Sequence, residues 1–333
     1  MCIRDRVSGI VLSGRSEISQ IALASNEGRK KHTSQKKQFK RFIENEHFNY
    51  ETHYFPFALA ILLSLAKRGH LEFSIDGSVA GRGCMVLMFS VIYKGKAIPI
   101  VWSVYKAKKG HLPQQTHQDL LVELKKLVPC DCLVTLLGDG EFDGCDWQED
   151  IIENGWNYVV RTSKNKHFED SDEDCFKAKM IGVGWGNTFF IEALRFTKKR
   201  FGPVNLLVWH DKKHKNPIIL ITNLDYVPDI KQLYKKRFKI EPFFRDQKSK
   251  GFNIQKSGLG IPERIAKLLI ASCLAYLLCI LGGLKALKSE FYDLISEQDQ
   301  EALSLFQLGL RFLRLLVDLR QWRAFSWKYD LQV

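Results

Sequence analysis

The sequence predicts an α/β protein with a mixed central sheet that is interrupted by a β-rich insertion and flanked by helical regions. Three observations predict this class. From about residue 71 to residue 162, short β-leaning apolar runs are followed by alternating helical and strand patterns. Further β-leaning runs fill residues 163–228. Helical periodicity dominates at residues 8–66 and again beyond residue 290.

Residues 1–70 are predicted to be a helical region. Two amphipathic stretches begin at Ser16 and Thr33, which would serve as N-caps, and Asn26–Gly28 joins them. The basic residues of the second stretch include Lys36, Lys37, Lys40 and Arg41. A helix–turn–helix-like DNA reader fits this region, and an ordinary helical hairpin with a basic face is the alternative. Met1–Arg6 is too short and charged for a secretory signal, so we expect a remnant at a truncated N-terminus.

The next part of the chain, residues 71–162, is predicted to begin the α/β core. Its expected elements are strands at 71–76, 84–93 and 97–104, a helix at 114–127, a strand at 132–138, a helix at 146–154 and a strand at 156–162. Three successive strands followed by alternating helix and strand match the ribonuclease-H-like fold, a mixed five-stranded sheet with helices. Residues 229–290 are assigned to the same core, on the far side of the insertion.

Two aspartates are candidate metal ligands. Asp76 and Asp139 each end or interrupt an apolar run, and each is followed by a glycine. Aspartates at the ends of buried strands are poorly solvated and repel one another unless they hold a cation or have a raised pKa. Carboxylate oxygens are the ligands that Mg²⁺ prefers. Taken singly, each aspartate is equally well interpreted as a turn former. Glu141 and Asp143 are alternative ligands.

The most informative spacing lies between Tyr234 and Lys248. Arg237, Glu241 and Lys248 follow Tyr234 at offsets of 3, 7 and 14 residues. In one continuous α-helix these positions share a face roughly 60° wide. A carboxylate flanked by two cations and a phenol suits holding a metal ion against a phosphate, and a solvated charged helix is the alternative. Pro242 is expected to disturb this helix, because proline clashes with the carbonyl four residues earlier.

The charge of the chain indicates a polyanionic partner. The net charge is +13, and basic residues cluster at 29–41 and again at 231–250, beside the carboxylate. Binding of these clusters to a phosphate backbone would be strong and sensitive to salt. A merely solubilising charge is the alternative. The eight cysteines complete no zinc-ligand spacing, so we expect reduced thiols in a cytoplasmic protein.

These motifs together resemble a known family. The segment from Tyr234 to Lys248 meets in full the Tyr-x2-Arg-x3-Glu-x6-Lys signature of DDE-type transposases of bacterial insertion sequences, in insertion-sequence family four. Asp76 and Asp139 occupy the places of the first and second catalytic aspartates. The resemblance runs over most of the chain, from about residue 15 to about residue 260.

The resemblance implies an enzyme that catalyses cut-and-paste DNA transposition. Asp76, Asp139 and Glu241 would be its catalytic residues and would bind two Mg²⁺ ions, which Mn²⁺ can replace. A metal-bound water would cut the element end, and the freed 3′-hydroxyl would then attack a second phosphodiester. A ribonuclease-H-like nuclease without strand transfer is one alternative. An inactive or domesticated copy that only binds DNA is the other.

The resemblance also implies the partners. Tyr234, Arg237 and Lys248 would contact the DNA backbone beside the cleaved bond, where negative charge builds up. Members of the family carry an N-terminal DNA-binding region, which favours the DNA-reading interpretation of residues 1–70. The implied partners are the double-stranded terminal inverted repeats, target DNA and a second copy of the chain in a homodimeric complex, with no membrane. The implied location is the bacterial cytoplasm, at the nucleoid.

The last part of the chain is predicted to be helical. Leu268–Leu284 is a charge-free stretch of 17 residues, at the lower limit for spanning a bilayer, and a buried core helix is the preferred interpretation. Within the C-terminal region, residues 291–333, an apolar helical stripe about 100° wide either closes the core or pairs two protomers. The stripe consists of Leu305, Leu308, Phe312, Leu315, Leu316 and Leu319.

Overall fold

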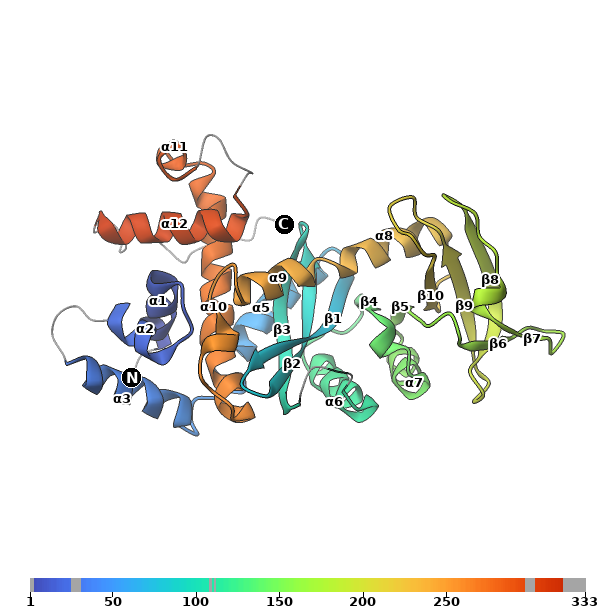
Figure 1. The fold of residues 1–333 in the computed structure, drawn as a ribbon, viewed down its shortest axis with the longest axis horizontal. Helices are drawn as coiled ribbons and strands as arrows, with labels where there is room; N and C mark the ends of the chain where they lie inside the picture. The colour runs from blue at the N-terminus through green and yellow to red at the C-terminus, as the bar shows by residue number, and fades with distance from the viewer. Residues whose placement is uncertain (1–2, 25–30, 108–109, 111, 297–302, 320–333) are drawn as a thin grey trace.

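The computed structural model describes residues 3–24, 31–107, 110, 112–296 and 303–319. Over these residues the chain forms a large mixed sheet with helices on its faces and a helical region at one end (Figure 1). The predicted mixed α/β class is therefore confirmed. The predicted joint at Asn26–Gly28 lies outside the described residues.

The strands form one continuous sheet within the described part of the chain. In chain order they are β1 (His70–Gly81), β2 (Cys84–Tyr93), β3 (Lys96–Lys106), β4 (Leu133–Gly138), β5 (Asn157–Arg161), β6 (His167–Glu169), β7 (Cys175–Lys177), β8 (Thr188–Phe196), β9 (Phe201–Trp209) and β10 (Ile218–Thr222). Their order across the 10-stranded sheet is β3-β2-β1-β4-β5-β10-β9-β8-β6-β7. β1 pairs in parallel with β4, and β4 with β5, whereas the other pairs are antiparallel. The strands of residues 163–228 therefore extend the five predicted strands rather than forming a second sheet.

Helices cover both faces of the core strands, and further helices form the region at one end of the sheet. They are α1 (Ile3–Ser13), α2 (Ile18–Ala24), α3 (His32–Glu44), α4 (Tyr50–His53), α5 (Phe55–Ala66), α6 (Gln114–Lys125), α7 (Cys145–Glu153), α8 (Val227–Arg237), α9 (Ile240–Gln247), α10 (Pro262–Ala286), α11 (Tyr292–Ile295) and α12 (Leu305–Asp318), with short 3-10 helices η1 (Gly140–Phe142), η2 (Ala178–Met180) and η3 (Ile254–Lys256). α6 and α7 lie on one face, and α8 and α9 lie on the other (Figure 1). Leu137 and Val159 point to the α8 face, where they pack with Ile230 and Leu233.

The core strands follow from their apolar runs. The first eight residues of β2 are all buried, because helices cover the sheet on both sides. A strand buried on both faces appears in the sequence as a continuous apolar run, which is why this strand was predictable. β2 turns into β3 through Lys94 and Gly95, whose φ angles of 45° and 73° are both positive, as a tight two-residue hairpin turn requires.

α10 is the core helix of the helical region. Among the described residues it is the helix with the length and apolar composition to cross a bilayer, yet 78% of its most apolar window is buried inside the fold. It packs against α12, α1 and β3. This burial agrees with the prediction of a core helix at Leu268–Leu284.

The apolar face of α12 closes that core, but it is rotated from the predicted stripe. Of the predicted residues, Leu305 and Leu315 are half-buried and Leu319 is exposed. The buried face turns toward Phe306 and Leu313, which the predicted stripe omits. The cause is a close helix crossing, in which a glycine of α12 lies against the backbone of α10.

The N-terminal helices start at other residues than predicted. α3 begins at His32 with Lys31 as its N-cap, so Thr33 lies inside the helix rather than capping it. Ser16 precedes α2 but is fully buried, its N–H donates to the Phe252 carbonyl, and its hydroxyl has no hydrogen-bond partner among the described residues. Both predicted caps are therefore wrong, because tertiary contacts rather than local capping fix these residues.

Candidate active site

The segment from Tyr234 to Lys248 is not one continuous helix, so the predicted single face is wrong. α8 and α9 are separated by Phe238 and the residue after it. Pro242 accounts for the break, because it has no N–H to donate to the Phe238 carbonyl and its ring would clash with that carbonyl. Instead the Phe238 carbonyl accepts a hydrogen bond of 3.2 Å from the N–H of Glu241. Pro242 itself lies in the first turn of α9, where an N–H would have no helical partner.

Asp76 and Asp139 arrive at the same place from adjacent parallel strands. The register of β1 with β4 ends at Ser74 opposite Leu137, so two residues further on Asp76 and Asp139 are level with each other. Neighbouring strands lie about 4.8 Å apart. Asp76 accepts a hydrogen bond of 2.8 Å from the N–H of the next residue, and Asp139 accepts one of 2.9 Å from the N–H two residues on. These bonds to the backbone fix both carboxylates beside the C-terminal end of β4.

Arg237 lies between two of the predicted catalytic carboxylates. Its Nη1 is 3.9 Å from Oδ2 of Asp76, and its Nη2 is 3.3 Å from Oε1 of Glu241. The Arg237 side chain is only 9% exposed, and its Nε is buried with no hydrogen-bond partner within the described residues. A buried, permanently charged guanidinium with an unused donor is suited to an anionic ligand.

Tyr234 interacts with this guanidinium and is 1% exposed. Burial raises the pKa of its phenol, and the positive charges of Arg237 and Arg161 oppose that rise. The phenol therefore stays protonated at neutral pH and is available as a hydrogen-bond donor.

Arg161 is a site residue that the sequence reasoning missed. It is the last residue of β5, and the parallel register of Gly138 with Val160 brings it level with Asp139. Asp76, Asp139 and Arg161 thus lie level with one another on three adjacent parallel strands. The available signal was its position directly after the buried run of β5, the same signal that identified Asp139 after β4.

The charge state of Asp76 reflects this crowding. Burial raises the pKa of Asp76 from its ordinary value to about 6, and repulsion from Asp139 and Glu241 adds to the rise. Arg237 and the hydrogen bond from the backbone oppose it. The three carboxylates are therefore close enough to interact electrostatically, although they come from segments far apart in the chain.

The donor set fits a divalent cation in its chemistry but is not closed around one. Asp76, Asp139 and Glu241 offer hard carboxylate oxygens, and their mutual repulsion would be relieved by a cation. No group of three potential metal-ligating side chains converges among the described residues. The Glu241 side chain is 55% exposed and contacts Arg237 instead.

Lys248 lies outside the two helices that hold the other signature residues. It directly follows α9, with its Nζ 5.9 Å from the centre of the Phe244 ring. The break between α8 and α9 therefore removes it from the predicted common face.

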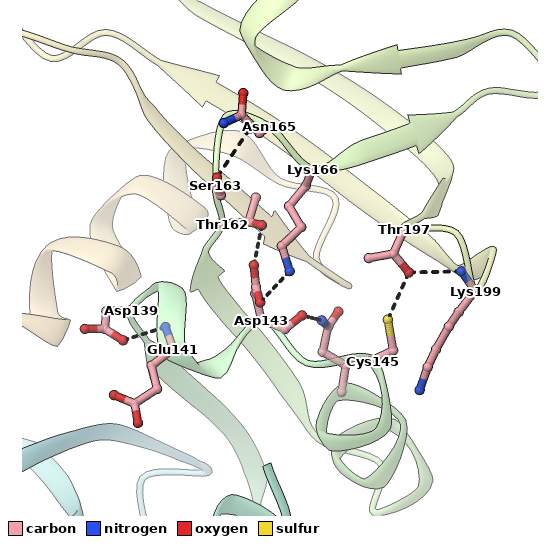
Figure 2. A network of polar contacts seen from close by, with 11 residues as sticks. Asp139, Glu141, Asp143, Cys145, Thr162, Ser163, Asn165, Lys166, Thr197 and Lys199 are labelled. Carbon is pink, nitrogen blue, oxygen red and sulfur yellow. Dashed lines mark hydrogen bonds and ion pairs between the residues drawn. The ribbon is translucent and has the colours of Figure 1, made fainter. Parts of the chain in front are cut away.

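The two alternative carboxylates are engaged elsewhere. Glu141 accepts a hydrogen bond of 2.7 Å from the N–H of Leu112. Asp143 accepts bonds of 2.6 Å from the Thr162 hydroxyl and 2.9 Å from the Lys166 ammonium, and Figure 2 shows this group pointing away from Asp139. Asp143 thus joins the loop after β4 to the start of the inserted strands, and neither residue is arranged as a metal ligand.

The predicted DNA-binding residues of the N-terminal region lie on one helix face. α3 buries Phe39 and Phe42, whereas the basic residues of the opposite face are all exposed. These exposed residues are Lys36, Lys37, Lys40 and Arg41. α3 belongs to the helical region at one end of the sheet, away from α8 (Figure 1).

A family model described as a transposase DDE domain matches residues 64–278, well over half of the chain. The chain belongs to the transposase DDE domain family. The match runs from the last turns of α5 into α10, so this DDE domain contains Asp76, Asp139 and Glu241. DDE transposase domains generally use divalent metals.

Solved structures include a distant likeness to this DDE domain. A piggyBac transposase, in a cryo-EM structure of its synaptic complex with hairpin DNA, matches with a TM-score of 0.45 and 11% identity. The match covers 79% of the present chain, which spans 55% of the piggyBac chain. No curated protein sequence matches the chain. The family model, rather than these comparisons, therefore carries the assignment.

Proposed function

We propose that the protein is an insertion-sequence transposase of the Tyr-x2-Arg-x3-Glu-x6-Lys group, insertion-sequence family four. It would cleave its element ends and transfer the freed 3′-hydroxyl to target DNA. The observation that carries this proposal is the electrostatic contact of Asp76, Asp139 and Glu241 around Arg237 at one edge of the sheet.

The proposed core is ribonuclease-H-like and comprises residues 71–162 and 229–290. Its support is the strand order β3-β2-β1-β4-β5, with three antiparallel strands followed by two parallel ones. Residues 163–228 would be the inserted β-rich unit, residues 1–70 the DNA-binding region and residues 291–333 the C-terminal helical region. Assembly as a homodimer on DNA, at the bacterial nucleoid, completes the proposal.

Asp76, Asp139 and Glu241 are the proposed catalytic residues and would hold Mg²⁺, as two ions that Mn²⁺ can replace. Such ions activate a water or a 3′-hydroxyl and stabilise the leaving oxygen of a phosphodiester. The exposed side chain of Glu241 has the freedom to turn from Arg237 toward the two aspartates. The raised pKa of Asp76 fits a carboxylate that gains stabilisation from a cation.

The neighbouring residues would bind the substrate. The unused Nε of Arg237 is suited to a phosphate oxygen beside the cleaved bond, where it would offset charge in the transition state. The protonated phenol of Tyr234 can donate a hydrogen bond to the same backbone. Lys248 would contact a phosphate further along, because it lies outside the group around Arg237.

A cleavage and joining assay tests this function. Purified protein is incubated with its own flanking DNA ends and Mg²⁺, and both 3′-hydroxyl ends and joined products are mapped. Glu241→Gln keeps the shape of the side chain but removes its charge, so we expect cleavage to be lost while DNA affinity stays within about twofold, since phosphate contacts dominate affinity.

Each outcome has one meaning. Metal-dependent cuts at the ends followed by joining, absent in the variant, establish the transposase. Cuts without joining favour a nuclease, and binding without cuts indicates an inactive copy. If Glu241→Gln reduces binding and cleavage together, Glu241 has a structural role instead.

A further inference from the structure

A second basic site lies beside the carboxylates. A groove of about 450 Å³ opens where β1 begins, between the end of α5, the turn joining β2 to β3, and the junction of α8 with α9. We name it the β1-edge groove. The lining residues that matter here are Arg68, Glu72, Tyr93, Lys94, Lys236 and Lys239.

The groove is strongly positive. Its four cations face a single carboxylate, Glu72, which accepts a hydrogen bond from Lys236. Among the described residues, none of Arg68, Lys94 and Lys239 has a carboxylate within ion-pair distance. Three cations without acidic partners, held around a concave surface, are suited to a polyanion rather than to a small neutral ligand.

Local structure holds these cations in position. The ring of Tyr93 lies between two of them, 4.9 Å from the Arg68 guanidinium carbon and 5.3 Å from Lys94 Nζ. Such cation–π contacts limit the positions of long side chains. Lys94 occupies the turn between β2 and β3, and Lys239 lies in the break between α8 and α9 that Pro242 causes. The same proline that separates Lys248 from the signature face thus brings Lys239 to the groove.

The groove lies close to the proposed active site. Glu72 and Asp76 lie on the same face of β1, because side chains alternate along a strand, and four residues of strand span about 13 Å. Lys236 and Arg237 are consecutive, and the first contacts Glu72 while the second contacts Asp76. A distance of about 13 Å corresponds to roughly four base pairs along a DNA duplex.

We propose that the β1-edge groove binds the sugar–phosphate backbone of a DNA duplex, roughly four base pairs from the scissile phosphate. The proposal rests on the proposed transposase function. Ammonium and guanidinium groups read the backbone rather than the base edges, so the contact is independent of sequence. The duplex is either the element end or the target DNA, which share this chemistry.

The test compares variants that are expected to change DNA affinity in opposite directions. Lys94→Gln with Lys239→Gln removes two phosphate contacts, so affinity falls about tenfold for an element end and for an unrelated duplex alike. The slope of log K against log salt becomes shallower by about 1 per lysine. Glu72→Gln removes the single negative charge and releases Lys236, so it strengthens binding. Fluorescence anisotropy on short labelled duplexes at several salt concentrations measures the affinity for the element end, the affinity for the unrelated duplex and the salt dependence of each.

Lys125→Gln with Lys126→Gln is the matched control, because these exposed lysines lie at the end of α6 on the opposite face of the sheet. The control should keep the wild-type affinity and salt slope if the loss of binding is specific to the lysines of the groove. If the groove variants also bind like wild type, or if Glu72→Gln weakens binding, the proposal is overturned. A general folding defect weakens binding in both groove variants and so does not imitate the expected pair of opposite effects.

Cleavage and joining by the same proteins separate the two proposals. Groove variants that lose cleavage assign the groove to the element end, and variants that lose only joining assign it to the target. If the wild type cleaves and joins DNA and the groove variants behave like it, the transposase proposal stands and the groove proposal is wrong. If the wild type does not cleave DNA but its DNA binding depends on Lys94 and Lys239, the groove proposal stands and the transposase proposal is wrong.

Discussion

Asp76 is held in an environment that costs the folded protein free energy. Its carboxylate is 20% exposed, and burial and neighbouring acids raise its pKa to about 6. A group whose pKa is higher in the folded than in the unfolded state is more easily ionised after unfolding. Asp76 therefore opposes folding wherever it is charged, as residues of ligand-binding sites often do.

Asp76→Asn is expected to stabilise the metal-free protein near neutral pH. The native pKa lies above the ordinary value, so the cost of the charge develops as pH rises from about 4 to about 6 and is fully present above that window. The rise of the pKa of Asp76 to about 6 corresponds to on the order of 3 kcal/mol of stability lost when the carboxyl group is ionised. Thermal unfolding in EDTA at pH 7.5 should show the gain, and the difference should vanish near pH 4.

The exposed Asp225→Asn is the control and should change stability little at either pH. A variant at Asp76 that is less stable than wild type at pH 7.5 would mean that its contact with Arg237 outweighs the cost of burial.

At the scale of elements, the break between α8 and α9 determines where the signature residues lie. Pro242→Ala restores an N–H that can donate to the Phe238 carbonyl, so the two helices are expected to join into one. Joining them would rotate Glu241 relative to Arg237 and the aspartates. We expect helical content, measured by circular dichroism, to rise slightly. We expect the cleavage rate to fall roughly tenfold to a hundredfold, because Glu241 would be misplaced relative to the aspartates. Unchanged cleavage together with increased helicity would show that the break is not needed.

The crossing of α10 and α12 is the second element that can be tested. A Cβ on Gly309 would overlap the carbonyl oxygen of Cys279 in α10, and backbone cannot move aside cheaply. Gly309→Ala should therefore lower the free energy of unfolding by about 3 kcal/mol, measured by denaturant titration. Gly182→Ala, where a Cβ would meet nothing within 4 Å, should have almost no effect. Equal stability of both variants would contradict the close crossing.

At the scale of the whole molecule, the positive charge is divided between separate surfaces. The net charge is +13, and one exposed basic face lies on α3 while other cations surround the carboxylates. Replacing the four exposed α3 residues by glutamine should weaken DNA binding without lowering stability, because these side chains cover no core. The residues are Lys36, Lys37, Lys40 and Arg41.

The measurement for α3 is again the salt dependence of DNA binding. If all four residues contact phosphates, the slope of log K against log salt should become shallower by about 3 to 4. Lys125→Gln with Lys126→Gln serves as the comparison. An α3 variant with the wild-type slope would favour the helical hairpin interpretation, in which the basic face is exposed to solvent and does not contact DNA.

Local signals in the sequence were enough to locate the elements of the core and the carboxylates at their ends. Apolar runs and turn residues act over a few neighbouring positions, so β2 to β5 lie close to their predicted ranges, and Asp139 directly follows β4. β1 differs from its prediction, because pairing with β2 continues it to Gly81, so Asp76 lies inside the strand rather than at its end. A carboxylate beside a buried apolar run is costly to desolvate, and this cost can be inferred from the neighbouring residues alone. Both aspartates were therefore identifiable from sequence.

The contacts of those residues depend on tertiary structure. The parallel register of β1, β4 and β5 brings Asp76, Asp139 and Arg161 together, and register is a long-range property. The break at Pro242 divides the segment into two helices, so Lys248 lies beyond the end of α9 rather than on one helix face with Tyr234 and Arg237. The β1-edge groove has no sequence motif, because its cations come from segments between residues 68 and 239. Periodicity describes one element at a time, whereas a site is formed by the packing of several.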